Sequence, residues 1–117
     1  MTFNVDGLTM DKQLMVCDLV AELGLDLVTL VDVRATKKQW PGIRRKLSDQ
    51  LRRTQMAWRF HFVEGAISGH RCTIGGQVVF HNDRLQKASF HEVTKLGATT
   101  RLDCMVGNEK YTSLGTY

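Results

Sequence analysis

Residues 25–34, Leu-Asp-Leu-Val-Thr-Leu-Val-Asp-Val-Arg, form the most continuous apolar and β-branched run in the chain. Gly24 precedes this run, and a basic polar segment follows it. A short run rich in Leu and Val between two helical patterns predicts a β-strand that is buried on both faces. Asp32 would then lie at the carboxyl end of the strand, where open α/β sheets bind their ligands. Because burying a lone carboxylate is costly, we expect Asp32 to be hydrogen-bonded, paired with a cation or bound to a metal.

The segments before that run predict a strand followed by a helix. Residues 1–5, Met-Thr-Phe-Asn-Val, predict a short strand, and Thr9 or Asp11 is placed to cap a helix. Gly24 suits the position just after a helix, so we expect this helix to end at about Leu23. Helical spacing predicts that its buried side carries Met15, Val16, Leu19, Val20 and Leu23.

The segment after the run predicts a second helix. Residues 35–39 are polar and predict a loop, and Trp40-Pro41 begins a helix with proline in its first turn. This helix is expected to end near Gln55. Its spacing predicts a buried side formed by Trp40, Ile43, Leu47 and Leu51, and a basic side formed by Arg44, Arg45, Lys46, Arg52 and Arg53.

The remaining chain predicts strands joined by turns. Residues 64–73 predict a loop, and the pairs 6–7, 82–83 and 107–108 (Asp-Gly, Asn-Asp and Gly-Asn) predict turns. We find no internal repeat and no linker, so we expect a single α/β domain across residues 1–117, with the order β-α-β-α followed by a run of strands. Those strands are expected at residues 57–63, 77–81, 90–96, 99–106 and 110–117.

Composition predicts a soluble protein of the nucleus or cytoplasm. The 117 residues carry a net charge of +4, which favours a polyanionic partner only slightly. The three cysteines are widely spaced, without a metal-binding or disulfide pattern, and this indicates reduced thiols. No apolar stretch is long enough to cross a bilayer and no signal-peptide pattern opens the chain, so we expect no membrane partner.

Two oxygen-bearing side chains are expected at the same edge of the predicted sheet. Asn4 and Asp32 both lie near the carboxyl ends of strands that should be adjacent. An amide and a carboxylate in this position suit a hard divalent cation such as Mg²⁺, which prefers oxygen ligands. In the alternative interpretation, Asp32 caps the loop that follows it and Asn4 supports a turn.

Basic residues offer two candidate sites for phosphate. The second helix and its end carry Arg44, Arg45, Arg52 and Arg53, which could contact the phosphates of a nucleic acid. The alternative is an ordinary solvated helix face, and no interleaved aromatic residues indicate base stacking. Arg34 is the better phosphate candidate, because it directly follows the acidic end of the central strand.

The histidines and the glycine pair do not predict sites of their own. His61, His70, His81 and His91 are spread along the chain, and no two of them have the helical spacing of metal ligands, so a zinc site is not expected. Gly75-Gly76 lacks the Lys-Ser/Thr of a phosphate-binding loop and precedes a predicted strand rather than a helix.

Four segments carry motifs in a common order. Residues 2–8 read Thr-Phe-Asn-Val-Asp-Gly-Leu, and residues 30–34 read Leu-Val-Asp-Val-Arg. Residues 75–80 read Gly-Gly-Gln-Val-Val-Phe, and residues 111–117 read Tyr-Thr-Ser-Leu-Gly-Thr-Tyr. Together they resemble the N-terminal half of the endonuclease/exonuclease/phosphatase superfamily, and most closely the apurinic-type endonuclease domains of non-LTR retrotransposons.

The resemblance implies roles for individual residues. Asn4 matches the family's metal-proximal asparagine, and Asp32 matches the glutamate that binds the catalytic Mg²⁺ or Mn²⁺, on a side chain one carbon shorter. Tyr117 matches the family's tyrosine near the scissile phosphate, which makes it the implied catalytic residue, and Arg34 could bind phosphate. The chain departs from the family pattern at Asp6, Val31, Val33 and Gly115.

The resemblance also implies a fold and an activity. The fold would be half of a four-layer α/β sandwich, in which two mixed sheets pack face to face with helices outside. The activity would be Mg²⁺-dependent phosphodiester hydrolysis that nicks nucleic acid, DNA in preference to RNA. The family's Asp-x-Asn segment and general-base histidine would lie beyond Tyr117, so we expect a truncated or degenerate domain that is weak or inactive alone. Exposed apolar surface would then favour self-association or a complementing C-terminal half.

Two other functions remain open at this point. The first is a non-catalytic module for nucleic-acid binding or assembly, which has kept the fold and lost the chemistry. The substitutions at Asp6, Val31 and Gly115 favour it, because all three lie near the expected site. The second is a phosphatase acting on a small phosphoester, because the same architecture supports that reaction too.

Overall fold

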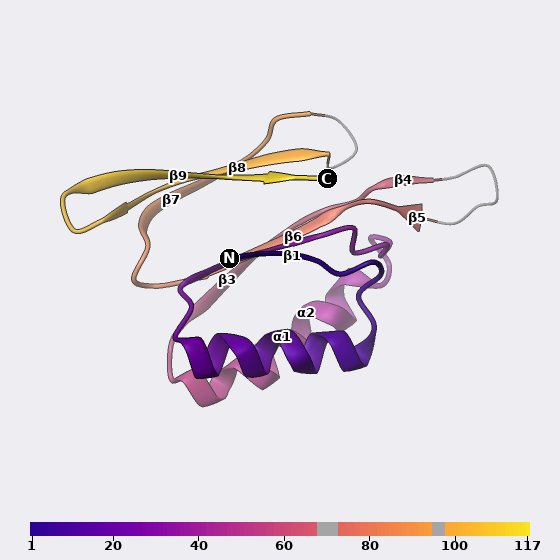
Figure 1. Ribbon diagram of the computed structural model, residues 1–117, viewed down its shortest axis with the longest axis horizontal. Helices are drawn as coiled ribbons and strands as arrows, with labels where there is room; N and C mark the ends of the chain where they lie inside the picture. The colour runs from indigo at the N-terminus through magenta and orange to yellow at the C-terminus, as the bar shows by residue number, and fades with distance from the viewer. Residues whose placement is uncertain (68–72, 95–97) are drawn as a thin grey trace.

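The computed structural model describes residues 1–67, 73–94 and 98–117, which form two α-helices and three β-sheets. The elements are β1 (Thr2–Asn4), α1 (Met10–Leu23), β2 (Leu27–Val31), α2 (Trp40–Leu51), the 3₁₀ turn η1 (Arg52–Thr54), β3 (Trp58–Val63), β4 (Ala66–Ile67), β5 (Thr73–Ile74), β6 (Gln77–Asn82), β7 (Gln86–Glu92), β8 (Thr99–Val106) and β9 (Glu109–Thr116). Strands β1-β2-β6-β3 form the central sheet, and both helices cover one of its faces (Figure 1). Strands β7-β8-β9 form a C-terminal sheet on the other face (Figure 1). The predicted mixed α/β class is confirmed.

The first helix forms where the sequence predicts it, but its buried side differs. The Thr9 side chain accepts a hydrogen bond from the Lys12 amide at 3.4 Å, and Gly24 ends the helix with a left-handed φ of 63°. The buried residues are Gln13, Val16, Cys17 and Val20. The prediction was wrong for Met15 and Leu23, whose exposed fractions are 54% and 55%.

The second helix agrees with its predicted pattern. Leu47 and Leu51 are completely buried, and Trp40 and Ile43 pack partly buried against the same core. The Trp40 ring stacks on Phe62 of β3 with ring centroids 5.0 Å apart, which fixes the start of the helix on the sheet. No helix within residues 1–67, 73–94 and 98–117 is long and apolar enough to span a bilayer.

The run at residues 25–34 contains the interior strand β2 of the central sheet, which is shorter than the run and ends at Val31. It pairs in parallel with β1 and antiparallel with β6. Val28 and Leu30 are completely buried in the core beneath the helices. Thr29 faces the C-terminal sheet, where a Cβ atom added to Gly115 would lie 2.7 Å from its methyl carbon. The expected burial on both faces is therefore confirmed.

Polar side chains fill part of the layer between the two sheets. Gln77 is completely buried, and its amide nitrogen donates to the carbonyl oxygens of Ala98 at 3.2 Å and Gly115 at 3.1 Å. The Thr100 hydroxyl donates to the Gln77 side-chain oxygen at 2.8 Å. Hydrogen bonds therefore join the sheets in addition to apolar contacts.

One strand prediction and one loop prediction need correction. β7 begins at Gln86 rather than at Phe90, because a bulge between Gln86 and Ser89 lets a stretch without apolar alternation pair with β8. The predicted loop 64–73 is wrong at its ends, since β4 pairs with β5 there. Residues 68–72 of that loop, and the predicted strand end at residues 95–96, lie outside the described residues.

Candidate active site

Asp32 is held at the end of β2 by three hydrogen bonds. Its side chain is only 5% exposed. The Arg34 guanidinium donates to both of its oxygens, at 3.1 Å from Nε and 3.0 Å from an Nη nitrogen, and the Gly75 amide donates to Oδ1 at 3.0 Å. The expectation that this carboxylate is hydrogen-bonded and paired is confirmed, and the partner present in the structure is Arg34.

An unusual backbone conformation brings this pair together. Asp32 and Arg34 have φ values of 59° and 53°, in the left-handed region that costs a non-glycine residue on the order of 1 kcal/mol. These two turns fold the chain so that Arg34 reaches back to the carboxylate two residues before it. Such strain is maintained only where surrounding contacts determine it, and it gathers at functional sites.

The glycine pair before β6 supplies those contacts. The Arg34 amide donates to the Gly75 carbonyl at 3.0 Å, and the Val33 amide donates to the Gly76 carbonyl at 3.3 Å. Both glycines have positive φ, and a Cβ atom on Gly76 would lie 2.9 Å from the backbone nitrogen of Gly65. Glycine at position 76 is therefore required where this segment packs against the Gly65 backbone, while the Gly76 carbonyl holds the Asp32 loop.

Asn4 and Asp6 lie beside this loop, at the end of the neighbouring strand. Asn4 is paired in register with Val31, so the two strands end side by side, as predicted. The Asn4 side-chain oxygen accepts a hydrogen bond from the Asp6 amide at 3.2 Å, which is the turn-supporting role of the alternative interpretation. The Asp6 carboxylate forms an ion pair with Arg34, which therefore bridges two acidic groups.

Tyr117 reaches the same site from the far end of the chain. Its ring carbons would lie 3.5 Å from a Cβ atom added to Gly75, and its amide donates to the Ala98 carbonyl at 2.8 Å. The Arg34 pKa is raised, chiefly by the hydrogen bond to Asp32, with smaller contributions from the charges of Asp32, Asp6 and Tyr117. The structure thus brings together the predicted site residues Asn4, Asp32, Arg34 and Tyr117.

The oxygen atoms at this site are of the kind that a hard divalent cation prefers. Asp6 and Asp32 supply carboxylates and Asn4 supplies an amide, a donor set that fits Mg²⁺ or Mn²⁺. All three are already engaged, because Arg34 pairs with both carboxylates and Asn4 accepts the Asp6 amide. In the described ranges no three His, Cys, Asp or Glu side chains are grouped to hold a metal ion. A cation at Asp32 would have to replace the guanidinium.

A groove of about 580 Å³ adjoins the site on the helical side. Arg34 lines it together with Lys38 and Lys46, and Gly7 and Gly42 form parts of its wall. Neither lysine forms an ion pair with any described residue. The uncompensated positive charge of the groove therefore comes from Lys38 and Lys46.

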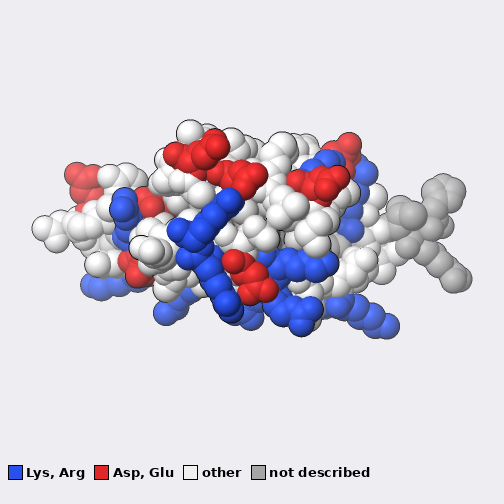
Figure 2. All heavy atoms as spheres, turned by 90° about the horizontal axis from the view of Figure 1, so that it is seen from below, with Lys and Arg blue, Asp and Glu red and all other residues white. Residues whose placement is uncertain are grey.

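The four arginines predicted to contact nucleic acid differ in their partners. Arg53 pairs with Asp18 of α1 at 2.6 Å, and Arg52 pairs with Asp49 at 3.4 Å. The other two, Arg44 and Arg45, are exposed and without an ion pair to any residue that the structure describes. Figure 2 views the helical side, where Lys and Arg side chains gather along the lower part and Asp and Glu side chains lie mostly along the upper part.

A histidine pair that the sequence did not predict lies between the sheets. His61 Nε2 and His81 Nε2 are 3.1 Å apart, and Phe90 of β7 stacks on His61 with ring centroids 4.6 Å apart. The imidazole centroids are 5.2 Å apart with the planes tilted by 17°, so the rings meet edge to edge and share an N–H···N hydrogen bond. Burial, His81 and Arg59 lower the pKa of His61 to about 4.

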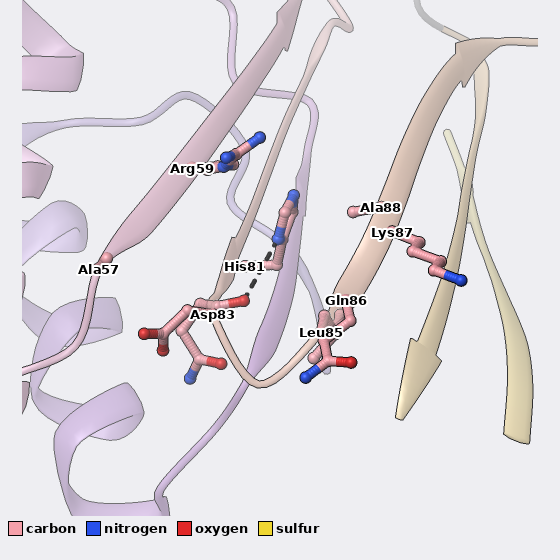
Figure 3. A pocket seen from close by; sticks show the side chains of 9 residues that line it. Ala57, Arg59, His81, Asp83, Leu85, Gln86, Lys87 and Ala88 are labelled. Atoms are coloured by element: carbon pink, nitrogen blue, oxygen red, sulfur yellow. Dashed lines mark hydrogen bonds between the residues drawn. The ribbon is translucent and has the colours of Figure 1, made fainter. Parts of the chain in front are cut away.

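A cleft of about 490 Å³ opens beside His81, at the end of the central sheet opposite Asp32. Arg59, Gln86 and Lys87 are among its lining residues. In Figure 3 His81 points from β6 toward β7, whereas the Lys87 side chain points away from the cleft. Since the imidazoles share their hydrogen bond in nearly one plane, their nitrogen lone pairs do not converge on a metal position.

Sequence reasoning missed two groups at the Asp32 site. Gly75 contributes a backbone amide, and its only signal was a glycine pair before a predicted strand. Asp6 was read as a turn residue and a departure from the family pattern, yet it is the second acidic partner of Arg34.

No protein-family model matches this chain, and no curated protein matches it either.

Proposed function

We propose that this chain is the metal- and phosphate-holding part of an endonuclease-type phosphodiester hydrolase that uses Mg²⁺ or Mn²⁺, and that it cleaves weakly or not at all alone. One observation carries the proposal. Asp32, a nearly fully buried carboxylate at the carboxyl end of a central strand, lies in a site that also includes Asn4, Arg34 and Tyr117. These residues come from three segments far apart in the sequence, and they are the ones that the family resemblance implies.

Each residue has a role in this proposal. Asp32 and Asn4 hold the divalent cation, which supplies stabilisation of negative charge on the phosphate being cleaved. Arg34 binds phosphate oxygens, since its planar guanidinium suits two parallel hydrogen bonds. Tyr117, with a half-exposed ring beside Gly75, contacts the scissile phosphate.

Nucleic acid, DNA in preference to RNA, is the proposed substrate. The groove lined by Arg34, Lys38 and Lys46 leads from the site toward the exposed Arg44 and Arg45 of α2. Several neighbouring cations suit a repeating chain of phosphates better than a single small phosphoester. This arrangement supports the nuclease proposal over the phosphatase alternative.

The layer order supports a finer description of the fold. One helical layer and two sheets correspond to three consecutive layers of a four-layer α/β sandwich, and we propose that the chain is the N-terminal half of one. Strand β9 is eight residues long, forms an edge of the C-terminal sheet and exposes Leu114 by 61%. That edge is available for self-association or for a complementing C-terminal half.

Low activity alone follows from the absence of a histidine base at this site among the described residues. His61 and His81 are paired between the sheets, and His91 contacts Ser89 and Asp103. Groups that activate water and stabilise the phosphate act as a unit, so part of a site gives far less than a proportionate rate.

A nicking assay on supercoiled plasmid tests the proposal. With Mg²⁺ or Mn²⁺ we expect little or no nicking, together with an ion-dependent increase in DNA affinity that Asp32→Ala abolishes. Arg101→Gln, on the C-terminal sheet, is the control and should bind as the unchanged protein does. Robust nicking that disappears in Asp32→Ala would overturn the claim of low activity, while ion-independent binding that survives in Asp32→Ala would overturn the metal role.

A second candidate function is supported by the same ion pair. Because Arg34 already engages both Asp32 oxygens, the site resembles one that has exchanged a metal for a guanidinium. The chain would then be a non-catalytic module that binds nucleic acid through Arg44, Arg45 and the groove lysines. Its affinity would fall steeply with salt and would not depend on a divalent ion.

A further inference from the structure

We propose that Arg34 acts as a latch on Asp32. In the resting protein Arg34 binds the Asp32 carboxylate, and when a divalent cation replaces it there, Arg34 binds a phosphate group instead. Cation and phosphate therefore bind cooperatively. This inference rests on the proposed function, because it treats Asp32 as a cation ligand. It adds a coupling between the two ligands that the proposed function does not require.

The two members of the pair differ in their freedom to move. The Asp32 side chain is 5% exposed and also accepts the Gly75 amide at 3.0 Å, so it stays in place when Arg34 leaves. The Arg34 side chain is 44% exposed and lines the groove that leads to Lys38 and Lys46. Rotation of its side chain into that groove therefore needs no rearrangement of the core.

The charges at the site favour the exchange. Asp6 and Asp32 together carry two negative charges, and Arg34 compensates only one of them. A divalent cation would compensate both carboxylates and leave the guanidinium with no acidic partner. The released guanidinium then matches phosphate oxygens with the same two-pronged geometry that it uses toward Asp32.

The exchange makes cation and phosphate binding reciprocal. In the resting protein, Arg34 competes with the cation for Asp32 and is itself withheld from phosphate. A bound phosphate that engages Arg34 removes the competitor and tightens cation binding, and linkage requires the same factor in the other direction. Couplings of this kind are typically about 5-fold to 150-fold.

The test measures Mn²⁺ affinity by electron paramagnetic resonance, with and without a short DNA duplex, on the full chain. The variants are Arg34→Asn, which tolerates positive φ, and Arg34→Lys, which keeps the charge but loses the two-pronged bond. The matched control is Arg101→Asn, because Arg101 pairs with an aspartate two residues away, Asp103, at 3.2 Å on the other sheet. Asp32→Asn reports whether binding occurs at Asp32.

We expect DNA to tighten Mn²⁺ binding to the unchanged protein by at least about 5-fold. Without DNA, Arg34→Asn and Arg34→Lys should bind Mn²⁺ more tightly than the unchanged protein, and the effect of DNA should shrink to less than about 2-fold in both. Arg101→Asn should match the unchanged protein in both conditions. If Arg34→Asn does not fold, Arg34→Lys decides, since its net charge is unchanged and a change in charge cannot explain tighter cation binding there.

The results that would overturn the latch alone differ from those that would overturn the proposed function. Mn²⁺ binding that Asp32→Asn abolishes, with equal affinity in the unchanged protein and both Arg34 variants, overturns the latch and leaves the proposed function standing. Mn²⁺ binding that is absent from every variant, or unaffected by Asp32→Asn, overturns the proposed function and the latch with it.

Discussion

Gly115 of β9 lies so close to Gln77 of β6 that no side chain fits at position 115. A Cβ atom added there would be 2.4 Å from the Gln77 side-chain oxygen and 2.9 Å from the Thr100 hydroxyl. Gln77 in turn donates to the Gly115 carbonyl at 3.1 Å, so the close approach and the hydrogen bond depend on each other. This contact connects the C-terminal sheet to the strand that follows the Gly75-Gly76 loop of the candidate site.

Gly115→Ala should therefore destabilise the protein. The methyl group would displace the Gln77 side chain, and overpacking of this kind costs about 1–3 kcal/mol. Urea denaturation should show a lower midpoint. Gly42→Ala is the control, because a Cβ atom there meets nothing within 4 Å and alanine favours the helix that contains it. Equal stability of Gly115→Ala and the unchanged protein would show that the sheets are not packed as described.

The two leucines Leu47 and Leu23 should respond differently to truncation. Leu47→Ala removes a completely buried side chain from the core beneath the helices and should cost about 2–5 kcal/mol of unfolding free energy. Leu23→Ala, at a position 55% exposed, should change the unfolding free energy by less than about 0.5 kcal/mol. A large loss in Leu23→Ala would mean that α1 buries the face that its sequence spacing predicts.

Stability should fall in acid because of the histidine pair. Burial, together with His81 and Arg59, lowers the pKa of His61 in the folded protein from 6.5 to about 4. Between these two pH values the unfolded chain therefore binds more protons than the folded protein. The stabilisation that comes from neutral His61 is fully present above about pH 6.5 and is lost as the pH falls toward 4. Urea denaturation at several pH values should show this slope, reduced in His61→Phe. A slope unchanged by that substitution would contradict the assignment.

Arg44 and Arg45 should contribute to nucleic-acid binding more than Arg53 does. The first two are exposed without an ion pair in the described part of the chain, whereas Arg53 pairs with Asp18 at 2.6 Å. Removing a cation that contacts one phosphate should reduce the magnitude of the slope of log K against log salt concentration by about one. Fluorescence anisotropy with a labelled DNA duplex measures this for Arg44→Gln, Arg45→Gln and Arg53→Gln. Equal effects of all three would assign binding to net charge rather than to this surface.

The sequence predicted the elements of the fold well because the local signals agreed. Thr9 and Gly24 mark the ends of α1, and the Leu- and Val-rich run gives the interior strand β2. The buried side of α1 was predicted less well, because Gln13 and Cys17 replace stronger apolar residues on the side that faces the core. Polar residues at the start of β7 hid that strand, since its pairing comes from β8 rather than from its own alternation.

The sequence predicted which residues belong to the candidate site, but not how they bond to one another. Asn4 and Asp32 could be placed at one sheet edge, because strand ends follow from the order of the elements. The bidentate bond from Arg34 could not be predicted, since it depends on positive φ at both Asp32 and Arg34, and arginine has no preference for that region. Contacts between distant segments, such as Gly75 with Asp32, leave no local pattern at all.

If Asp32 is the proposed ligand of the divalent cation, an ion bound there must lie close to the backbone of the candidate site. Paramagnetic broadening by Mn²⁺ of backbone amide signals in the ¹⁵N-labelled chain tests it most directly. We expect selective loss of the signals of Asn4, Asp32, Arg34 and Gly75 at low Mn²⁺ concentration, and no such loss in Asp32→Asn. Uniform broadening, or selective broadening that persists in Asp32→Asn, would contradict it.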